Sequence, residues 1–179
     1  MEEKKIIVKY LTTPVGELIL GAWENQLCLC DWRYRKMRGS IDKRIQEGLN
    51  ATFKEGDDPV FPLVEKQISE YFEGDRSSFD IPLILIGSTF QKMVWTSLQE
   101  IPYGKTESYV TLSKKLGDVK AIRAVASANG ANAISIIVPC HRIIGSKGEL
   151  VGYAGGLQVK KKLLKLENRG QRPEQLEMF

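Results

Sequence analysis

The sequence predicts an α+β fold, with an N-terminal antiparallel β-sheet domain that carries helices and a C-terminal domain that is mainly helical. The first third of the chain alternates short apolar runs with turn residues, whereas the second half places apolar residues at helical spacing. The charge also changes sign, because residues 1–87 hold 12 Lys and Arg against 15 Asp and Glu, and residues 88–179 hold 14 against 7. We therefore expect an N-terminal domain at 1–87, a C-terminal domain at 88–169 and a frayed tail at 170–179.

The N-terminal domain is predicted to begin as a β-meander. A strand begins at Ile6–Val8, and strands at Leu18–Trp23 and Leu27–Trp32 follow after turn-forming residues. An apolar stripe at helical spacing then indicates a helix that ends at Gly74. The stripe consists of Leu63, Ile68, Tyr71 and Phe72. Residues 79–86 contain a proline and are interpreted as an edge strand or an extended linker.

The C-terminal domain is predicted to contain a helix-turn-helix in a winged-helix-like arrangement. A capping-box pattern at 88–91 opens a first helix, whose apolar face ends at Ile101. Two short helices at 109–116 and 119–129 follow, joined by a turn that contains glycine. The final helix, 158–168, carries three consecutive lysines at 160–162, which we interpret as a solvated face.

Composition limits the cellular setting. No apolar segment approaches the roughly 18 to 20 residues that span a bilayer, and the first residues do not resemble a signal peptide. The cysteine count of three is odd, and Cys28 and Cys30 fall in one strand pattern, where core packing is expected. We expect a reduced, cytoplasmic protein without membrane contact, nucleoid-associated in a bacterium and nuclear in a eukaryote. The basic C-terminal half indicates an anionic partner.

A cysteine stands next to the only histidine of the chain, in the segment Val138-Pro139-Cys140-His141-Arg142. A thiol attacks as its thiolate, and a nearby imidazole or positive charge promotes ionisation of the thiol. The apolar run 134–138 predicts a short buried strand with Cys140 at its end. Adjacent strand residues point to opposite faces, so Cys140 and His141 cooperate only if the backbone turns or a water bridges them. A buried cysteine beside a surface histidine is the alternative.

The second helix of the helix-turn-helix is built from small residues, and Arg123 is its only charged residue after Lys120. Small side chains let a helix approach another surface closely. Either the helix packs tightly in a core, or it presses against a nucleic-acid groove, where an arginine can insert. The small residues are Ala121, Ala124, Ala126, Ser127, Ala128 and Gly130.

Several spaced motifs resemble the O6-alkylguanine-DNA alkyltransferases, the methylated-DNA–protein-cysteine methyltransferases. The segment Ile137 to Ile144 is similar to the active-site signature of that family, and 152–157 is similar to its glycine-rich loop. Lys160, Leu163, Leu164 and Glu167 match the last helix of the family, and residues 103–104, 108–109 and 123–125 match its helix-turn-helix. The resemblance covers about residues 90 to 167 and is looser in the first 87.

The resemblance implies roles for individual residues. Cys140 would take the alkyl group, His141 would remove the thiol proton through a water, and Glu167 would orient the imidazole. Asn132 would brace the turn beside the cysteine, and Tyr109 would help to rotate the nucleotide and would donate a hydrogen bond to the guanine. Contact with DNA would come from Arg123, which fills the gap in the duplex, and from Tyr109, Ala124, Ala126, Ser127 and Gly130. The guanine pocket would be formed by Tyr109, Val138, Ile143, Tyr153 and Ala154.

The activity implied by the resemblance is irreversible, single-turnover repair of O6-alkylguanine, with O4-alkylthymine as a second candidate substrate. The implied partner is double-stranded DNA that contains alkylated guanine, bound through the minor groove by a monomer that flips the base. No cofactor is expected, and no metal either, because the one histidine is already assigned. This chain departs from the family where Ala133 replaces the usual proline after Asn132, and where Ile143 replaces the commoner valine.

Three alternatives are open. A sensor that binds alkylated DNA without transfer would lack the cysteine. A Cys-His hydrolase would turn over and would need an oxyanion hole, and it would leave Tyr109 and Arg123 without a purpose. A plain helix-turn-helix regulator would leave the Pro-Cys-His-Arg segment unexplained and would dimerise on spaced half-sites.

Overall fold

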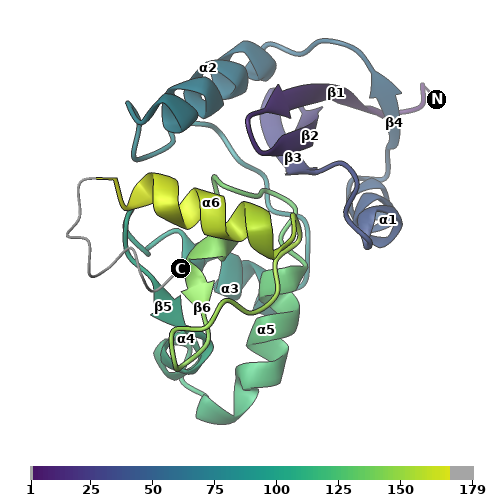
Figure 1. The fold of residues 1–179 in the computed structure, drawn as a ribbon. Helices are drawn as coiled ribbons and strands as arrows, with labels where there is room; N and C mark the ends of the chain where they lie inside the picture. The colour runs from purple at the N-terminus through teal and green to yellow at the C-terminus, as the bar shows by residue number, and fades with distance from the viewer. Residues whose placement is uncertain (1, 170–179) are drawn as a thin grey trace. The chain divides into compact units, whose positions relative to one another are not determined.

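The computed structural model describes residues 2–169 and divides into two compact units, with the division between Ser88 and Thr89. The first unit holds a sheet with flanking helices, and the second is mainly helical, so the α+β prediction is confirmed (Figure 1). Within residues 2–169, no helix has both the length and the apolar character that a membrane crossing requires. The predicted frayed tail at 170–179 lies outside the described residues.

The sheet of the first unit is mixed, with strand order β3-β2-β1-β4. Strands β1 (Lys5–Thr13), β2 (Gly16–Trp23) and β3 (Gln26–Trp32) form the predicted antiparallel meander. The prediction of a wholly antiparallel sheet is wrong, because β4 (Thr52–Glu55) pairs in parallel with β1. A helical crossover from β3 returns the chain to the other edge of the sheet in the same direction as β1, and this connection makes the pairing parallel.

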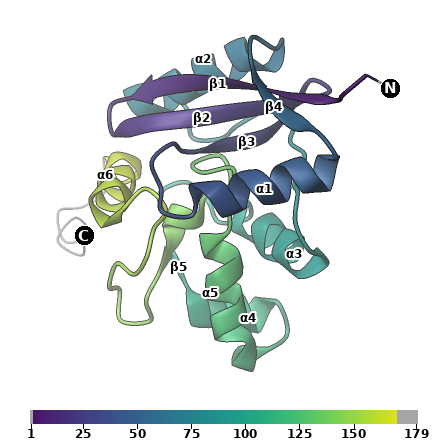
Figure 2. The ribbon, with the colours of Figure 1, turned by 90° about the vertical axis from the view of Figure 1, so that its right-hand side faces the viewer.

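Two helices, α1 (Arg38–Leu49) and α2 (Val60–Glu73), flank this sheet (Figures 1 and 2). The predicted stripe lies on α2, where Ile68 and Tyr71 are buried and the helix ends at Gly74. Helix α1 was not predicted, because Ile41 and Ile45 are its only buried residues and give a weak periodic signal. The two cysteines of β3 are buried, as expected for core residues.

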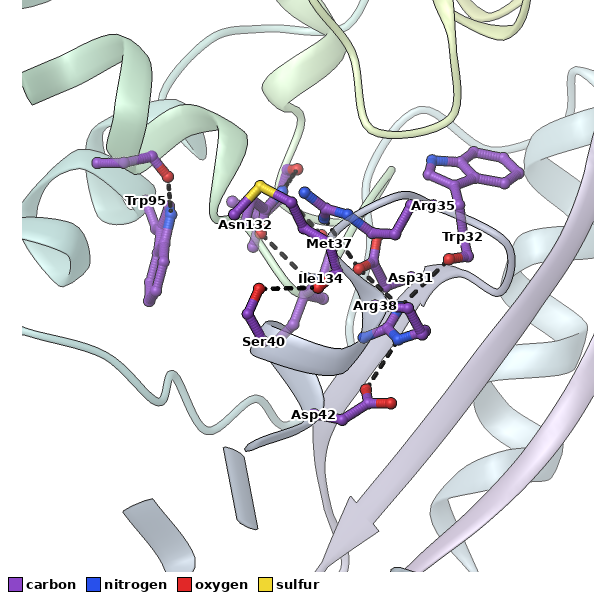
Figure 3. Close-up of polar contacts among 12 residues, drawn as sticks. Asp31, Trp32, Arg35, Met37, Arg38, Ser40, Asp42, Trp95, Asn132 and Ile134 are labelled. Carbon is purple, nitrogen blue, oxygen red and sulfur yellow. Dashed lines mark hydrogen bonds and ion pairs between the residues drawn. The ribbon is translucent and has the colours of Figure 1, made fainter. Parts of the chain in front are cut away.

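A buried carboxylate joins β3 to the start of α1. Figure 3 shows Asp31 between two guanidinium groups, with Arg35 Nη1 at 3.0 Å and Arg38 Nη1 at 2.9 Å from its Oδ2. Arg38 also pairs through Nε with Asp42 on α1, at 2.8 Å. A buried charge needs such partners, so this network fixes where α1 leaves the sheet.

The segment after α2 is extended and makes one bridge to the sheet. The amide of Leu27 donates to the carbonyl of Pro82, and the amide of Ile84 donates back to the carbonyl of Leu27. Only an isolated parallel bridge forms there, because Pro82 has no amide hydrogen to continue a ladder.

The second unit is built around the predicted helix pair. Helix α5 (Ile122–Gly130) packs against α3 (Thr89–Leu98) and against α4 (Tyr109–Lys115). A 3₁₀ turn at Val119–Ala121 precedes α5, so the second helix of the pair begins later than predicted. The last helix is α6 (Leu157–Glu167). A short parallel pair, β5 (Glu107–Ser108) with β6 (Ile143–Ile144), was not predicted.

The predicted strand at 134–138 is wrong, because these residues form consecutive tight turns. The amide of Val138 donates to the carbonyl of Ile134 at 2.9 Å, and Ile136 has a positive φ of 71°. All five residues are buried, and a short apolar run does not by itself distinguish a strand from a buried turn. Cys140 therefore begins a 3₁₀ turn, Cys140–Arg142, and does not end a strand.

Candidate active site

The turn that carries Cys140 is held from inside by Asn132. The side-chain oxygen of Asn132 accepts from the amide of Ile134 at 3.0 Å, and its Nδ2 donates to the carbonyl of Val138 at 2.9 Å. The amide of Cys140 donates to that same carbonyl at 2.8 Å. Asn132 thus lies where the resemblance placed a brace, and it takes over backbone hydrogen bonds that a strand would have made.

His141 and Glu167 are 26 residues apart in the sequence, and their side chains form a buried hydrogen-bonded pair. His141 Nε2 lies 2.6 Å from Glu167 Oε1, and the two side chains are 0% and 1% exposed. A carboxylate oxygen only accepts, so Nε2 carries the hydrogen and Nδ1 of a neutral ring offers a lone pair. Within residues 2–169, Nδ1 is a buried atom without a hydrogen-bond partner. The imidazole therefore has one nitrogen fixed and the other ready to take a proton.

Arg142 completes the surroundings of Glu167. Its Nε lies 2.9 Å from Oε2 and its Nη2 lies 3.0 Å from Oε1, while Nη1 donates to the carbonyl of Ile101 at 2.7 Å. Burial raises the pKa of Glu167, but the charges and hydrogen bonds of His141 and Arg142 outweigh it and lower the pKa to about 2. Glu167 is therefore ionised at neutral pH.

Tyr109 lies at the start of α4, directly after the capping residue Ser108, whose side chain accepts from the amide of Thr111. The Tyr109 hydroxyl donates to the carbonyl of Val151 at 3.4 Å, which is long for a hydrogen bond. Burial raises the pKa of this phenol, and the charge of the Cys140 thiolate raises it further. Tyr109 and Cys140 therefore share one local environment, although 31 residues separate them in the sequence.

Lys160 corrects the interpretation of the lysine run, because its side chain is completely buried. Its Nζ donates to three backbone carbonyls, those of Ile143 at 2.5 Å, Val151 at 3.1 Å and Gly152 at 3.2 Å. The loop at 151–152 is thus tied to β6. Burial lowers the pKa of Lys160 to about 8.

The sequence contained a signal for this burial. Lys160 stands three, four and seven residues before Leu163, Leu164 and Glu167, so it lies on the same face of α6 as these buried residues. A run of three lysines masks that periodicity, since Lys162 is exposed as predicted.

The predicted pocket residues come from two segments. Val138 and Ile143 are completely buried, and Tyr153 and Ala154 are half-buried. The ring of Tyr153 stands edge-on to the imidazole of His141, with centroids 6.4 Å apart. The glycine-rich loop therefore lies beside the Cys140–His141 turn.

Helix α5 has one face in the core and one face open. Val125 and Ala128 are buried, and the indole Nε1 of Trp95 donates to the carbonyl of Ala128 at 2.8 Å. The residues assigned to DNA contact on this helix are exposed. They are Arg123, Ala124, Ala126, Ser127 and Gly130. Helix α5 therefore packs in the core on one face and leaves the other face, with Arg123, exposed.

Family models match nearly all of the described chain. Residues 89–169 match the model described as "6-O-methylguanine DNA methyltransferase, DNA binding domain". Residues 6–85 match the ribonuclease-like domain of the same description.

Relatives of known name match at similar length. A methylated-DNA–protein-cysteine methyltransferase of Methanosarcina acetivorans is 43% identical over 155 residues, which cover 87% of this chain and 94% of the relative. The inducible enzyme of that name from Bacillus subtilis is 40% identical over 162 residues, covering 89% and 84%. The crystal structure of Mycobacterium tuberculosis O6-methylguanine methyltransferase superposes with a TM-score of 0.78 at 34% identity, covering 97% and 99%. A structure of M. tuberculosis OGT in complex with DNA gives the same TM-score and identity, covering 96% and 98%.

Proposed function

This chain belongs to the 6-O-methylguanine DNA methyltransferase family, and from that premise we propose that it repairs DNA by moving the alkyl group of O6-alkylguanine onto Cys140. The observation that carries the proposal is the buried pair of His141, the residue directly after the cysteine, and Glu167. Nδ1 of this histidine has no hydrogen-bond partner among residues 2–169. A base oriented by a carboxylate and placed beside a thiol is what activates a sulfur nucleophile.

The transfer is a displacement at the alkyl carbon. The thiol proton passes through a water to Nδ1 of His141, and the sulfur forms a bond to the carbon as the bond from carbon to O6 breaks. The guanine keeps the electron pair, and Tyr109 stabilises it by donating a hydrogen bond. The guanine that leaves takes up one proton, which balances the proton lost by the thiol.

The product is a thioether, and this determines the stoichiometry. A carbon–sulfur bond of this kind has no leaving group that His141 could activate, so Cys140 is not regenerated. Each chain therefore acts once, and the reaction needs no cofactor. A Cys-His hydrolase, by contrast, would release its acyl group to water and turn over.

Access to the base requires that it leave the duplex, since the alkyl carbon is hidden inside stacked DNA. The exposed face of α5 enters the minor groove, and Arg123 inserts into the space that the base vacates. The backbone of α5 comes close to the DNA because the residues on its exposed face have small side chains or none. These residues are Ala124, Ala126, Ser127 and Gly130. The flipped guanine is received between Tyr109 and the walls at Val138, Ile143, Tyr153 and Ala154. The protein works as a monomer.

The first experiment is intact mass after incubation with excess duplex that contains one O6-methylguanine. We expect a gain of about one methylene, the net change when a methyl group replaces the thiol hydrogen, mapped to the Cys140 peptide and saturating at one per chain. Cys140→Ser is expected to bind the same duplex and to gain no mass. An unchanged wild-type mass with tight binding would instead indicate a damage sensor, and an unchanged mass without binding would refute a role in alkyl transfer.

A further inference from the structure

The outward face of α6 carries a group of positive charges that the mechanism above does not use. We call it the α6 stripe, and it consists of Lys161, Lys162, Lys165 and Arg169. Arg169 follows the end of α6 by two residues, and its amide donates to the carbonyl of Leu166, which continues the helical path. At about 100° per residue, the four side chains fall within about 100° of arc, opposite the buried side of the helix. Lys161 is partly exposed, and the other three are exposed.

No acidic side chain balances the charges of the α6 stripe. Glu167 is the one carboxylate of α6, and it is buried against His141 and Arg142. Within residues 2–169, none of the four side chains of the stripe has an ion-pair partner. By contrast, the lysine of α1 and the lysine of α2 each pair with a glutamate four residues later in the same helix. The α6 stripe is therefore an uncompensated surface charge.

These charges repel one another at their spacing on the helix. Lys161 and Lys165 are four residues apart, and Lys162 and Lys165 are three apart, where like charges destabilise a helix. The helix dipole favours cations near the C-terminal end, which accounts for Lys165 and Arg169 but not for the two lysines near the middle of α6. A polyanion bound along the stripe would relieve this repulsion.

The α6 stripe lies away from the elements that the proposed function places against the DNA. Helix α5 packs against α3 and α4, whereas α6 contacts the turn Cys140–Arg142. Figures 1 and 2 both show α6 and α4 at opposite ends of the second unit. From Lys161 to Arg169 the stripe is about 12 Å long, and duplex DNA carries one negative charge per about 1.7 Å of its axis. The four cations can therefore each meet a phosphate of one duplex segment.

We propose that the α6 stripe binds the phosphate backbone of a second DNA segment while the first segment lies on α5. The inference rests on the proposed function, which supplies the first segment and the reason for an anionic partner. A molecule with two backbone-binding faces takes hold of a new segment before it releases the old one. It can therefore search for alkylated guanine by passing directly between duplex segments, because backbone contacts of this kind do not depend on sequence.

The rate at which one duplex leaves the protein in the presence of another tests this inference. Cys140→Ser, which the reaction cannot consume, is bound to a labelled duplex and mixed with an excess of unlabelled duplex at low salt. A protein with one binding face releases the label at a rate that does not depend on the competitor concentration. With a second face the competitor joins the complex first, so we expect the rate to rise about threefold or more over about a hundredfold increase in competitor. Raising the salt concentration should remove this rise.

Charge-neutral variants show whether the α6 stripe is responsible. In the same Cys140→Ser background, the double variant Lys162→Gln with Lys165→Gln should lose the rise. Lys36→Gln with Lys54→Gln, at two exposed positions of the first unit, is the charge-matched control and should keep it.

A flat rate with the intact stripe would overturn the inference, and so would an equal rise in the stripe variant, which would assign the second segment to other cations. If the rate is flat and poly-glutamate binds only the chain with the intact stripe, the stripe serves an acidic protein instead of DNA. Lys161→Gln with Arg169→Gln repeats the test if the first double variant does not fold. Exchange between duplexes needs no alkyl transfer, so a wild-type chain that takes up no alkyl group would refute the proposed function without removing a measured rise.

Discussion

At the scale of single residues, the one carboxylate of Glu167 accepts hydrogen bonds from two side chains, those of His141 and Arg142. His141 lies on Oε1, and Arg142 reaches both oxygens. An arginine keeps its charge at every relevant pH, so it compensates Glu167 even while the imidazole is neutral. Glu167 is therefore ionised at neutral pH, and its hydrogen bond with Nε2 leaves Nδ1 of His141 as the nitrogen that can receive a thiol proton.

Replacing this carboxylate should affect both reaction and acid stability. Glu167→Gln leaves His141 without its charged orienter, and we expect the alkylation rate to fall about a hundredfold. The wild-type pKa is lowered from 4.5 to about 2, so the stabilisation is complete above 4.5 and is lost as the pH falls toward 2. Urea unfolding from pH 6 to pH 2 should show that loss in the wild type and a flatter profile in the variant. Parallel profiles would contradict this assignment.

Lys160 was predicted to lie on a solvated face, but its side chain is completely buried. Its ammonium group donates to three backbone carbonyls, those of Val151 and Gly152 in the loop before α6 and that of Ile143 in β6. Lys160→Met fills similar volume but leaves those carbonyls without their donor. We expect a loss of about 2–4 kcal/mol in the free energy of unfolding, measured by urea titration at pH 7. Lys162→Met, at an exposed position of the same helix, is the matched control and should change stability by less than about 0.5 kcal/mol.

The difference in free energy of unfolding between the wild type and Lys160→Met should also depend on pH, and this provides a second check. Folding lowers the pKa of Lys160 from 10.5 to about 8, so the unfolded chain binds more protons between these values. The stability of the wild type relative to Lys160→Met should therefore rise as the pH increases through this window. A falling difference would mean that the folded state favours the charged amine.

At the scale of elements, regular periodicity was predictable and tight turns were not. The three meander strands and helices α2, α3, α4 and α6 follow from apolar spacing and turn residues. Strand β4 and helix α1 have few buried side chains, because one lies at the sheet edge and the other is held largely by the Asp31 ion pairs. Such tertiary contacts leave no periodic mark in a sequence.

The segment 134–138 shows the same limit inside the site. It contains the right apolar residues for a strand, yet Asn132 satisfies its backbone groups and Ile136 adopts a left-handed conformation. The residue types of the site could be chosen from the sequence and the family resemblance. The Lys160 contacts could not, because they depend on which backbone carbonyls come within reach of the amine after folding.

The exposed face of helix α5 leads to a prediction about the repair of duplex DNA. Its open face carries one charged residue, Arg123, among small neighbours. If Arg123 fills the space left by the flipped base, Arg123→Ala should slow repair of duplex O6-methylguanine about tenfold or more, because the duplex recloses on the base. Reaction with free O6-benzylguanine needs no flipping and should keep its rate. Lys92→Ala on α3 is a charge-matched control, and equal slowing with both substrates would argue against insertion.

At the scale of the whole molecule, the two units divide the charge unequally. Residues from 88 onward hold all of the excess positive charge, whereas the unit with the mixed sheet is slightly acidic. The helix-turn-helix region adds exposed lysines at positions 105, 114 and 120, while Lys115 is paired with Glu107. Attraction to phosphates should therefore come from one unit, and the acidic unit should reduce non-specific association.

Salt dependence measures how many of these charges meet phosphates. If Lys105, Lys114 and Lys120 each neutralise one phosphate, a plot of log affinity against log salt concentration for Cys140→Ser and duplex DNA should have a slope of about −3. Lys120→Gln should make the slope shallower by about one, whereas Lys54→Gln in β4 should leave it unchanged. The rate with free O6-benzylguanine should not depend on salt, since no counterions are released. A slope near zero would mean that the basic charge of this unit does not face the DNA, and binding would then have to rest on the contacts of α5 alone.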